Sequence, residues 1–523
     1  MKQTPLIFAA LVFAAAAQAQ PQPDLIARIH FAGAKQISAD TNHLAFTNEF
    51  CSAEARALES QTLDKLSRVP GAWFKSKIAP GAGDCAEQLR PLLGDLLKSE
   101  WLFEMRDTTN GSPEYALAVR LSPERAQLWS DNLVAVFQDW MGVAISQDKA
   151  GNWEFRKHQP PDLFQFSRSD DWVVIDCGQN ELSLGREMLQ NAAANNGWLS
   201  VNADWPRLAQ LFPALKEFDF PKIQMQVAGR DGNFRLTGRL ALARPLPPVE
   251  PWRVPTNTIR QPFNSFTAAR GVAPWLQKQG WARPFFIRPQ PDQLFIWAQS
   301  NIPFQTFAAE PVPDAKAALA QLDRQMSGNT NWQRYFINPL TLMTTNDEIS
   351  LLGLPFIVPL VQAVHERAGD FLVGGFFPNG GRSRPMPPAL LARLSQPGLV
   401  YYHWEITAER LNELPQLSQL LFVFTGHQQL DGQSTAAKWL NLIGPKLGNS
   451  DTEVTQTAPD ELAFQRTAPG GLTAIELLLF ANWLESPQFP AFDLRMPPPT
   501  PHIRHGQKPL KVLSAPPVAP VPP

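Results

Sequence analysis

Ile223-Gln224-Met225-Gln226-Val227 alternates apolar with polar residues, and a second alternating run from Phe234 to Leu242 follows the turn Gly229-Arg230-Asp231-Gly232-Asn233. Apolar residues at every second position are typical of a strand that buries one of its faces. Two such strands joined by a short turn that contains Gly, Asp and Asn predict an antiparallel β-hairpin.

A strand and a helix precede this hairpin. Trp198 to Ala203 reads as a strand, and Asp204-Trp205-Pro206 then offers an N-cap residue and an early proline, both typical of a helix start. Tyr115 to Leu121 and the helical pattern that continues to Trp140 show the same arrangement. Hairpins, alternating strands and helices with one apolar face together predict an α+β fold of largely antiparallel sheets, with helices packed on one face.

Four segments of the N-terminal half have partners in the C-terminal half, in the same order and roughly 180–200 residues further along the chain. This order predicts two related halves that arose by duplication. The alternative is that any α+β chain contains similar runs of strand and helix by chance. The four pairs are Trp101–Phe103 with Trp281–Phe286, Tyr115–Leu121 with Phe295–Ala298, Trp172–Ile175 with Phe371–Val373, and Trp198–Ala203 with Leu399–Trp404.

Three later runs also predict strands, namely Thr452–Gln456, Leu462–Arg466 and Leu472–Leu479. The turn sequences Pro459-Asp460 and Pro469-Gly470-Gly471 separate them. The hairpin of the first half is therefore expected to have a counterpart near the end of the second.

The ends of the chain and a proline-rich segment near its middle set the expected domain boundaries. Lys2, the apolar stretch Pro5–Ala17 and Ala17-Gln18-Ala19 form a secretory signal peptide, residues 1–19, with cleavage near Ala19. We expect a first half at residues 20–244, which includes an N-terminal helical part, a linker at 245–257 and a second half at 258–495. Residues 496–523 predict a disordered proline-rich tail. The mature protein is therefore expected in the periplasm or outside the cell.

The composition excludes several classes of protein. Among the 523 residues, 46 Lys and Arg stand against 48 Asp and Glu, which gives a net charge of −2. Nucleic-acid binding depends largely on excess positive charge, so nucleic acid is not an expected partner. After the signal peptide, no apolar stretch is long enough to predict a transmembrane segment. The 50 prolines argue against a simple helical bundle, because a proline inside a helix costs about 3 kcal/mol.

The chain has three cysteines, Cys51, Cys85 and Cys177. Exported proteins can form disulfides, and Cys51 and Cys85 each precede a helical pattern, so these two are the candidate disulfide pair. Cys177 follows an apolar strand and is expected to be a buried structural thiol. A catalytic role would require a nearby histidine and a low pKa for this thiol, and His158 is the only histidine near it in sequence.

Sequence motifs for catalysis, cofactors and metals are absent from the chain. It contains no G-x-S-x-G, H-E-x-x-H, C-x-x-C or Walker motif, and no G-x-G-x-x-G between a strand and a helix. Asp170 and Asp171 could act as paired carboxylates in glycoside hydrolysis, but adjacent residues at the entrance to a strand more often form a turn. We therefore predict no catalytic, cofactor-binding or metal-binding residues, and no cofactor.

Four stretches of the chain resemble an uncharacterised family of exported bacterial proteins with two similar halves. They are Ala53–Leu58, Leu117–Trp129, Ser265–Leu276 and Tyr401–Leu414. The resemblance implies an exported protein with two halves, and it carries no known activity, ligand or catalytic residue.

These observations favour a non-enzymatic binding or scaffold protein of the periplasm or cell envelope. Its partner would be an apolar or glycan ligand, held where domains meet, or a cell-envelope protein. One alternative is an envelope hydrolase whose site lies between the two halves and contains facing carboxylates or a Cys177–histidine pair. Another is a structural protein whose proline-rich tail binds a partner.

Overall fold

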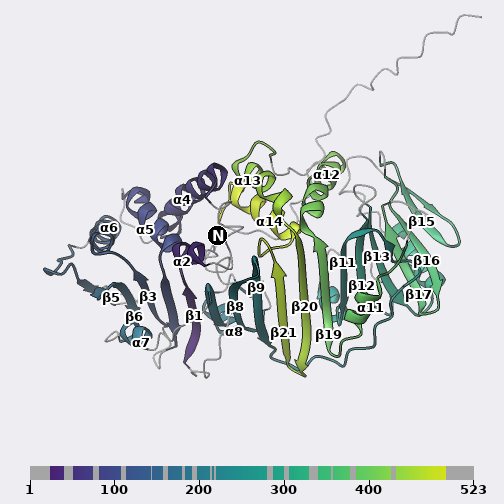
Figure 1. The fold of residues 1–523 in the computed structure, drawn as a ribbon, viewed down its shortest axis with the longest axis horizontal. Helices are drawn as coiled ribbons and strands as arrows, with labels where there is room; N and C mark the ends of the chain where they lie inside the picture. Colours follow the sequence, from purple (N-terminus) through teal and green to yellow (C-terminus); the bar gives the residue numbers. More distant parts are fainter. Residues whose placement is uncertain are drawn as a thin grey trace, which may run out of the picture.

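The computed structural model describes most of the chain between residues 24 and 490. In these ranges the protein is a mixed α+β structure built on one large antiparallel sheet, which confirms the predicted fold class (Figure 1). The described ranges are 24–40, 51–74, 82–107, 113–142, 144–156, 163–178, 183–190, 197–212, 215–216, 220–278, 287–299, 305–328, 340–354, 357–376, 384–425 and 431–490. The expected signal peptide and proline-rich tail lie outside them.

Nineteen strands of the described residues form this sheet, and the two halves of the chain supply its two sides. From the outer edge inward, the first side contains β4 (Trp153–Arg156), β5 (Leu163–Ser169), β6 (Trp172–Gly178), β3 (Glu114–Arg120), β2 (Trp101–Arg106), β1 (Leu25–Phe31), β7 (Leu199–Asp204), β8 (Lys222–Arg230) and β9 (Asn233–Ala241). From the centre outward, the second contains β21 (Glu461–Ala468), β20 (Asn449–Ala458), β19 (Leu399–Ile406), β11 (Phe263–Arg270), β12 (Gln293–Gln299), β13 (Thr306–Val312), β17 (Gly369–Gly375), β16 (Leu360–Glu366), β15 (Glu348–Leu352) and β14 (Thr341–Thr344). A separate ladder pairs β10 (Arg260–Gln261) with β18 (Arg384–Pro385).

The two sides join through β9 and β21, which pair from Phe234 opposite Ala468 to Ala241 opposite Glu461. Gly238 lies at this junction, where a β-carbon would come within 2.4 Å of the Gln224 carbonyl oxygen. Only glycine fits such a close approach of side chain and backbone. The halves are therefore joined edge to edge in one sheet.

Outward from this junction, the strands of the two sides follow the same order. The pairs at corresponding places are β9 and β21, β8 and β20, β7 and β19, β1 and β11, β2 and β12, β3 and β13, β6 and β17, and β5 and β16. The predicted partner of Tyr115–Leu121 needs correction, because Phe295–Ala298 belongs to β12 whereas the strand at the place of β3 is β13. Trp281–Phe286 lies outside the described residues.

The helices also occupy corresponding places in the two halves. α5 and α9 each connect the strands at the places of β1 and β2, whereas α6 and α10 follow β3 and β13. α7 and α11 follow β6 and β17, and α8 and α12 follow β7 and β19. The helix bounds are α2 (Ala34–Ala39), α4 (Ala53–Phe74), α5 (Ala86–Lys98), α6 (Pro123–Met141), α7 (Leu184–Gln190), α8 (Trp205–Leu211), α9 (Ala273–Lys278), α10 (Ala315–Gly328), α11 (Pro388–Leu394), α12 (Thr407–Thr425), α13 (Thr435–Ile443) and α14 (Ala474–Glu485).

Local sequence explains where these helices begin. The Ser122 side chain accepts a hydrogen bond from the Arg125 backbone N–H at the start of α6, and Pro123 occupies its first turn. The predicted strand Leu472–Leu479 is wrong, because its residues from Ala474 onward lie in α14. Thr473 and Glu476 form a capping box there, which satisfies backbone donors at the helix start. No helix in the described ranges is long and apolar enough to cross a membrane.

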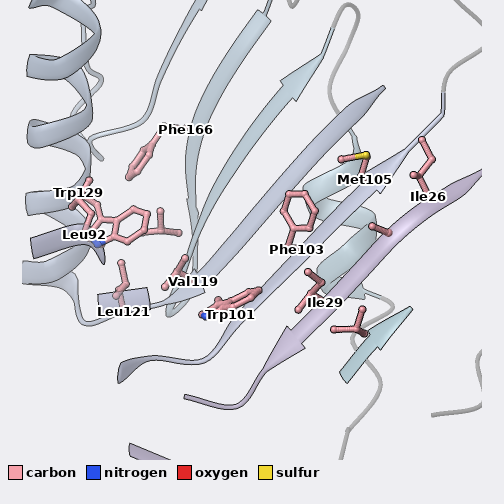
Figure 2. Close-up of a cluster of buried hydrophobic side chains, with 14 of the residues drawn as sticks. Ile26, Ile29, Leu92, Trp101, Phe103, Met105, Val119, Leu121, Trp129 and Phe166 are labelled. Atoms are coloured by element: carbon pink, nitrogen blue, oxygen red, sulfur yellow. The ribbon is translucent and has the colours of Figure 1, made fainter. Parts of the chain in front are cut away.

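The expectation of helices on one face needs correction, because each face of the sheet carries helices, and we name the faces after them. α6 covers the first side of the α6 face, where its Trp129 belongs to one buried cluster with Trp101, Phe103 and Val119 of the strands (Figure 2). The pairing registers place α10 on this same face of the second side, against Leu372. α7 and α11 pack on the opposite face, the α7 face.

The two halves bury their main apolar cores on opposite faces. In the first half the larger cluster lies on the α6 face, and the α7 face carries the buried Glu104 beside Arg28 and Arg106. In the second half Trp297 and its aromatic neighbours fill the α7 face under α11. On the α6 face of the second half, α10 covers a smaller apolar cluster, whereas β11 and β19 present the polar side chains of Thr267, His403 and Glu405.

The proline-rich segment predicted as a linker at 245–257 packs against the second half. Trp252 contacts Phe295, with ring centroids 5.7 Å apart, and the Arg270 guanidinium lies over the Trp252 ring. The Arg253 backbone N–H donates to the Gln293 side chain. The segment therefore forms part of the second core.

Candidate functional site

The residues that the sequence proposed for a disulfide are not bonded. Cys51 and Cys85 are free thiols. Cys85 has a left-handed backbone at the start of α5, and its Sγ lies 3.4 Å from Asp139 Oδ2. Burial and the neighbouring Asp139 raise the pKa of the Cys85 thiol to about 11. No Cys51–Cys85 disulfide is seen in the described structure, where Cys85 contacts a carboxylate of α6, and the pairing stays a prediction.

The other sequence candidates for chemistry also occupy structural positions. Asp170 has φ +52° in the turn between β5 and β6, and the exposed Asp171 pairs with Arg120. Cys177 lies on β6, where burial raises the pKa of its thiol to about 12. A thiol with so high a pKa is a poor nucleophile. His158 lies outside the described residues.

A polar cluster that the sequence did not indicate lies on the α6 face of the second half. Thr267 of β11 and His403 of β19 are directly paired, and Thr267 Oγ1 lies 2.8 Å from His403 Nδ1. His403 Nε2 lies 3.4 Å from Glu405 Oε2. The hydroxyl, imidazole and carboxylate therefore form a continuous row across two strands.

Glu405 connects this row to the helices above the sheet. Its Oε1 accepts hydrogen bonds from the Ala474 backbone N–H at 2.7 Å and from Thr407 Oγ1 at 2.9 Å. These donors lie at the starts of α14 and α12, where a helix favours negative charge. Burial acts to raise the pKa of Glu405, but hydrogen bonds to His403, Ala474 and Thr407 together lower it. Glu405 is therefore a buried carboxylate that anchors two helices.

The row has the residue types of a hydrolytic triad but lacks other parts of such a site. A triad needs backbone or side-chain donors that stabilise the oxyanion of the intermediate. Thr267 and His403 lie inside a ladder, where β11 pairs with strands on both sides and its backbone groups are engaged. Thr267 therefore has no free backbone donors beside it, and the row is better suited to support than to catalysis.

Beside this row, β12 and β13 form a part of the α6 face that lies between two groups of helices. α10 packs on β15, β16 and β17, whereas α12 packs on β11, β19 and β20. We call the intervening surface the β12–β13 floor. Its residues on this face are Leu294, Ile296, Ala298, Thr306, Ala308 and Glu310.

Comparison with the first half shows how the floor differs from a closed core. There the corresponding strands β2 and β3 carry Trp101, Phe103 and Val119, which pack beneath Leu92 of α5 (Figure 2). The floor instead has small or partly exposed side chains, so it is the best candidate for a ligand-binding surface.

Glu310 is the only charged residue of the floor. It lies opposite Leu372 of β17, and its neighbours on the same face of β13 are Ala308 and Val312. Burial raises the pKa of the Glu310 carboxyl from 4.5 to about 7, with no charged or hydrogen-bonding group contributing. Asp370 and His365 lie nearer the strand ends and pair with each other. Glu310 is therefore a desolvated carboxyl in apolar surroundings.

This carboxyl should make stability fall as the pH rises from about 4.5 through about 7. In that range the folded protein retains a proton that the unfolded chain releases, so deprotonation opposes folding. The difference in pKa corresponds to about 3 kcal/mol. Urea unfolding at pH 5 to 8 should show this decline in the free energy of unfolding, and Glu310→Gln should remove most of it.

Asp176→Asn provides the matched control. Burial raises the pKa of Asp176 only to about 6, so its contribution to the decline in the free energy of unfolding ends near pH 6. The control should keep the decline between pH 6 and 7. An unchanged decline in Glu310→Gln would show that Glu310 titrates normally.

Local sequence patterns did not predict this site. Thr267 and His403 are far apart in the chain, and only the register of β11 and β19 brings them together. The one available signal was Glu310 itself, a charge within the run Thr306-Phe307-Ala308-Ala309-Glu310. No group of three or more His, Cys, Asp or Glu side chains in the described residues could hold a metal ion.

Comparisons with known proteins add no constraint on this site. No family model and no curated protein matches the chain. The crystal structure of the di-domain ARO/CYC StfQ from the steffimycin biosynthetic pathway aligns with 63% of this chain and 84% of its own. At 10% identity and a TM-score of 0.08, that alignment supports no conclusion about fold or function.

Proposed function

We propose that the protein is an exported, non-enzymatic binding protein that holds a small apolar ligand on the β12–β13 floor. The proposal rests on one observation. Helices and aromatic side chains cover β2 and β3 in the first half, whereas the corresponding β12 and β13 present small or partly exposed residues. Binding sites are mostly apolar surfaces with a few placed polar groups, and Glu310 would supply such a group. The signal-peptide pattern at residues 1–19 supports export to the periplasm or beyond.

We also infer that the two halves descend from one duplicated unit. The shared order of strands and helices supports this origin. Duplication would let one half retain a closed core while the other acquired a binding surface. The hydrolase alternative has less support, because Thr267 lacks free backbone donors and the halves meet edge to edge.

Replacing Ala308 with tryptophan tests where the ligand lies. Ala308 is partly exposed at the middle of the floor, opposite Ile296 of β12 and Gly374 of β17. An indole at this position should cover the floor and abolish binding. Native mass spectrometry of protein isolated from its own envelope fraction should therefore show bound ligand in the wild type and none in Ala308→Trp.

Ala241→Trp is the matched control, because Ala241 is exposed at the end of β9 and far from the floor in the sheet order. It should retain the ligand, and both variants should unfold at the wild-type temperature. Equal ligand occupancy in Ala308→Trp and Ala241→Trp would contradict the assignment of the floor.

A further inference from the structure

We propose that the floor selects ligands with a cationic amine, which Glu310 binds through its carboxylate; this inference rests on the proposed function. The starting observation is that Glu310 has no hydrogen-bond or ion-pair partner in the described part of the chain. An unpartnered carboxylate in apolar surroundings opposes folding. A carboxylate that destabilises the fold in this way therefore indicates another function, such as binding a ligand.

The five acidic residues that are fully buried in the described ranges each have a partner. A fully buried carboxylate without a partner is therefore not found among them. Glu104 pairs with Arg106 at 3.1 Å, Asp204 with Lys222 at 2.7 Å, Asp176 with the Gly185 backbone N–H at 2.8 Å, Glu366 with the Asn257 backbone N–H at 3.0 Å, and Glu405 with the Ala474 backbone N–H at 2.7 Å.

The first half has a structural residue at the position on β3 that corresponds to Glu310 on β13. Leu117 of β3 pairs with Ile175 of β6 at the same distance from the β5–β6 turn as Glu310 and Leu372 from the β16–β17 turn, and it packs against the first core. The second half thus has a carboxylate where the first half has a leucine that packs against its core. Glu310 also remains partly exposed, so a ligand can reach it.

The surroundings of Glu310 define the ligand chemistry. Leu294 and Ile296 provide apolar surface on the adjacent strand, and Ala308 and Gly374 are the small residues paired beside it. A single negative group beside apolar surface complements an amphiphile with one positive group. A primary alkylamine has this chemistry, because its ammonium donates hydrogen bonds to a carboxylate and its chain covers the apolar residues.

Isothermal titration calorimetry at pH 8 with decylamine, 1-decanol and decanoate tests the proposal. The three probes share a chain length and differ in the charge of the head group. Wild-type protein should bind decylamine about tenfold more tightly than 1-decanol, and decanoate more weakly still. Glu310→Gln should bind decylamine and 1-decanol equally. Lowering the pH from 8 to 6 should weaken decylamine binding to the wild type about tenfold, because Glu310 becomes protonated.

The outcomes separate this inference from the proposed function. Equal affinity of the wild type for decylamine and 1-decanol, with both lost in Ala308→Trp, would overturn the role of Glu310 and leave the floor as a binding site. Absence of binding for all three probes would overturn both. A preference for decylamine that persists in Glu310→Gln would place the anionic group elsewhere.

Discussion

Replacing Glu405 with alanine should lower the free energy of unfolding by about 3–5 kcal/mol. The substitution removes the acceptor for the Ala474 backbone N–H and Thr407 Oγ1, and it leaves His403 without its carboxylate. Each buried donor left without a partner costs about 1–3 kcal/mol. The starts of α12 and α14 would lose their common anchor on the sheet. Urea unfolding followed by circular dichroism measures the loss.

Glu453→Ala is the matched control for this substitution. Glu453 lies on the neighbouring strand β20, and its carboxylate pairs with the exposed Arg393. A pair of this kind contributes at most about 1 kcal/mol. Similar losses for Glu405→Ala and Glu453→Ala would contradict the anchoring role of Glu405.

Replacing Trp297 with alanine should also destabilise the protein by about 3–5 kcal/mol, because it creates a large cavity in the second core. Trp297 is completely buried on the α7 face and stacks on Phe307 with ring centroids 5.3 Å apart. Its indole Nε1 has no hydrogen-bond partner in the described structure. Trp297→Phe should therefore lose much less stability than Trp297→Ala, since it keeps the aromatic packing and removes an unsatisfied donor.

Urea unfolding of both Trp297 variants gives the comparison. A loss of less than about 1 kcal/mol in Trp297→Ala would mean that the second core lies elsewhere. A loss in Trp297→Phe as large as in Trp297→Ala would show that the indole N–H has a partner. The expected difference between the variants follows from packing alone.

Local patterns were sufficient to predict the central hairpin and several helices. Alternation in residues 223–242 and the turn around Asp231 correspond to β8 and β9, and Ser122-Pro123 marks the start of α6. These features depend on residues that are close together along the chain, so they can be predicted from the sequence alone.

The prediction failed where local patterns conflict or where pairing is distant. Residues 472–479 form a nearly continuous apolar run that suits a strand or a buried helix equally, and the capping box of Thr473 and Glu476 was the deciding signal. The choice of β12 in place of β13 as the partner of β3 followed from matching strands without their registers. Polarity on a given face depends on register, so the row from Thr267 to Glu405 could not be read from the sequence.

The comparison of the halves also explains why the candidate site lies in the second one. The first half fills the α6 face with large side chains such as Trp101 and Phe103, whereas the second places its aromatic core on the α7 face around Trp297. That exchange leaves the α6 face of β12 and β13 free of a large core. The floor and Glu310 are consequences of this arrangement.

Native mass spectrometry of the mature wild-type protein, purified gently from its own envelope fraction, tests the central claim most directly. We predict a chain that begins at Gln20 and carries one additional mass the size of a small amphiphile, which dissociates as an amine. A bare protein mass, with no adduct under conditions that preserve the fold, would contradict a binding function for the floor.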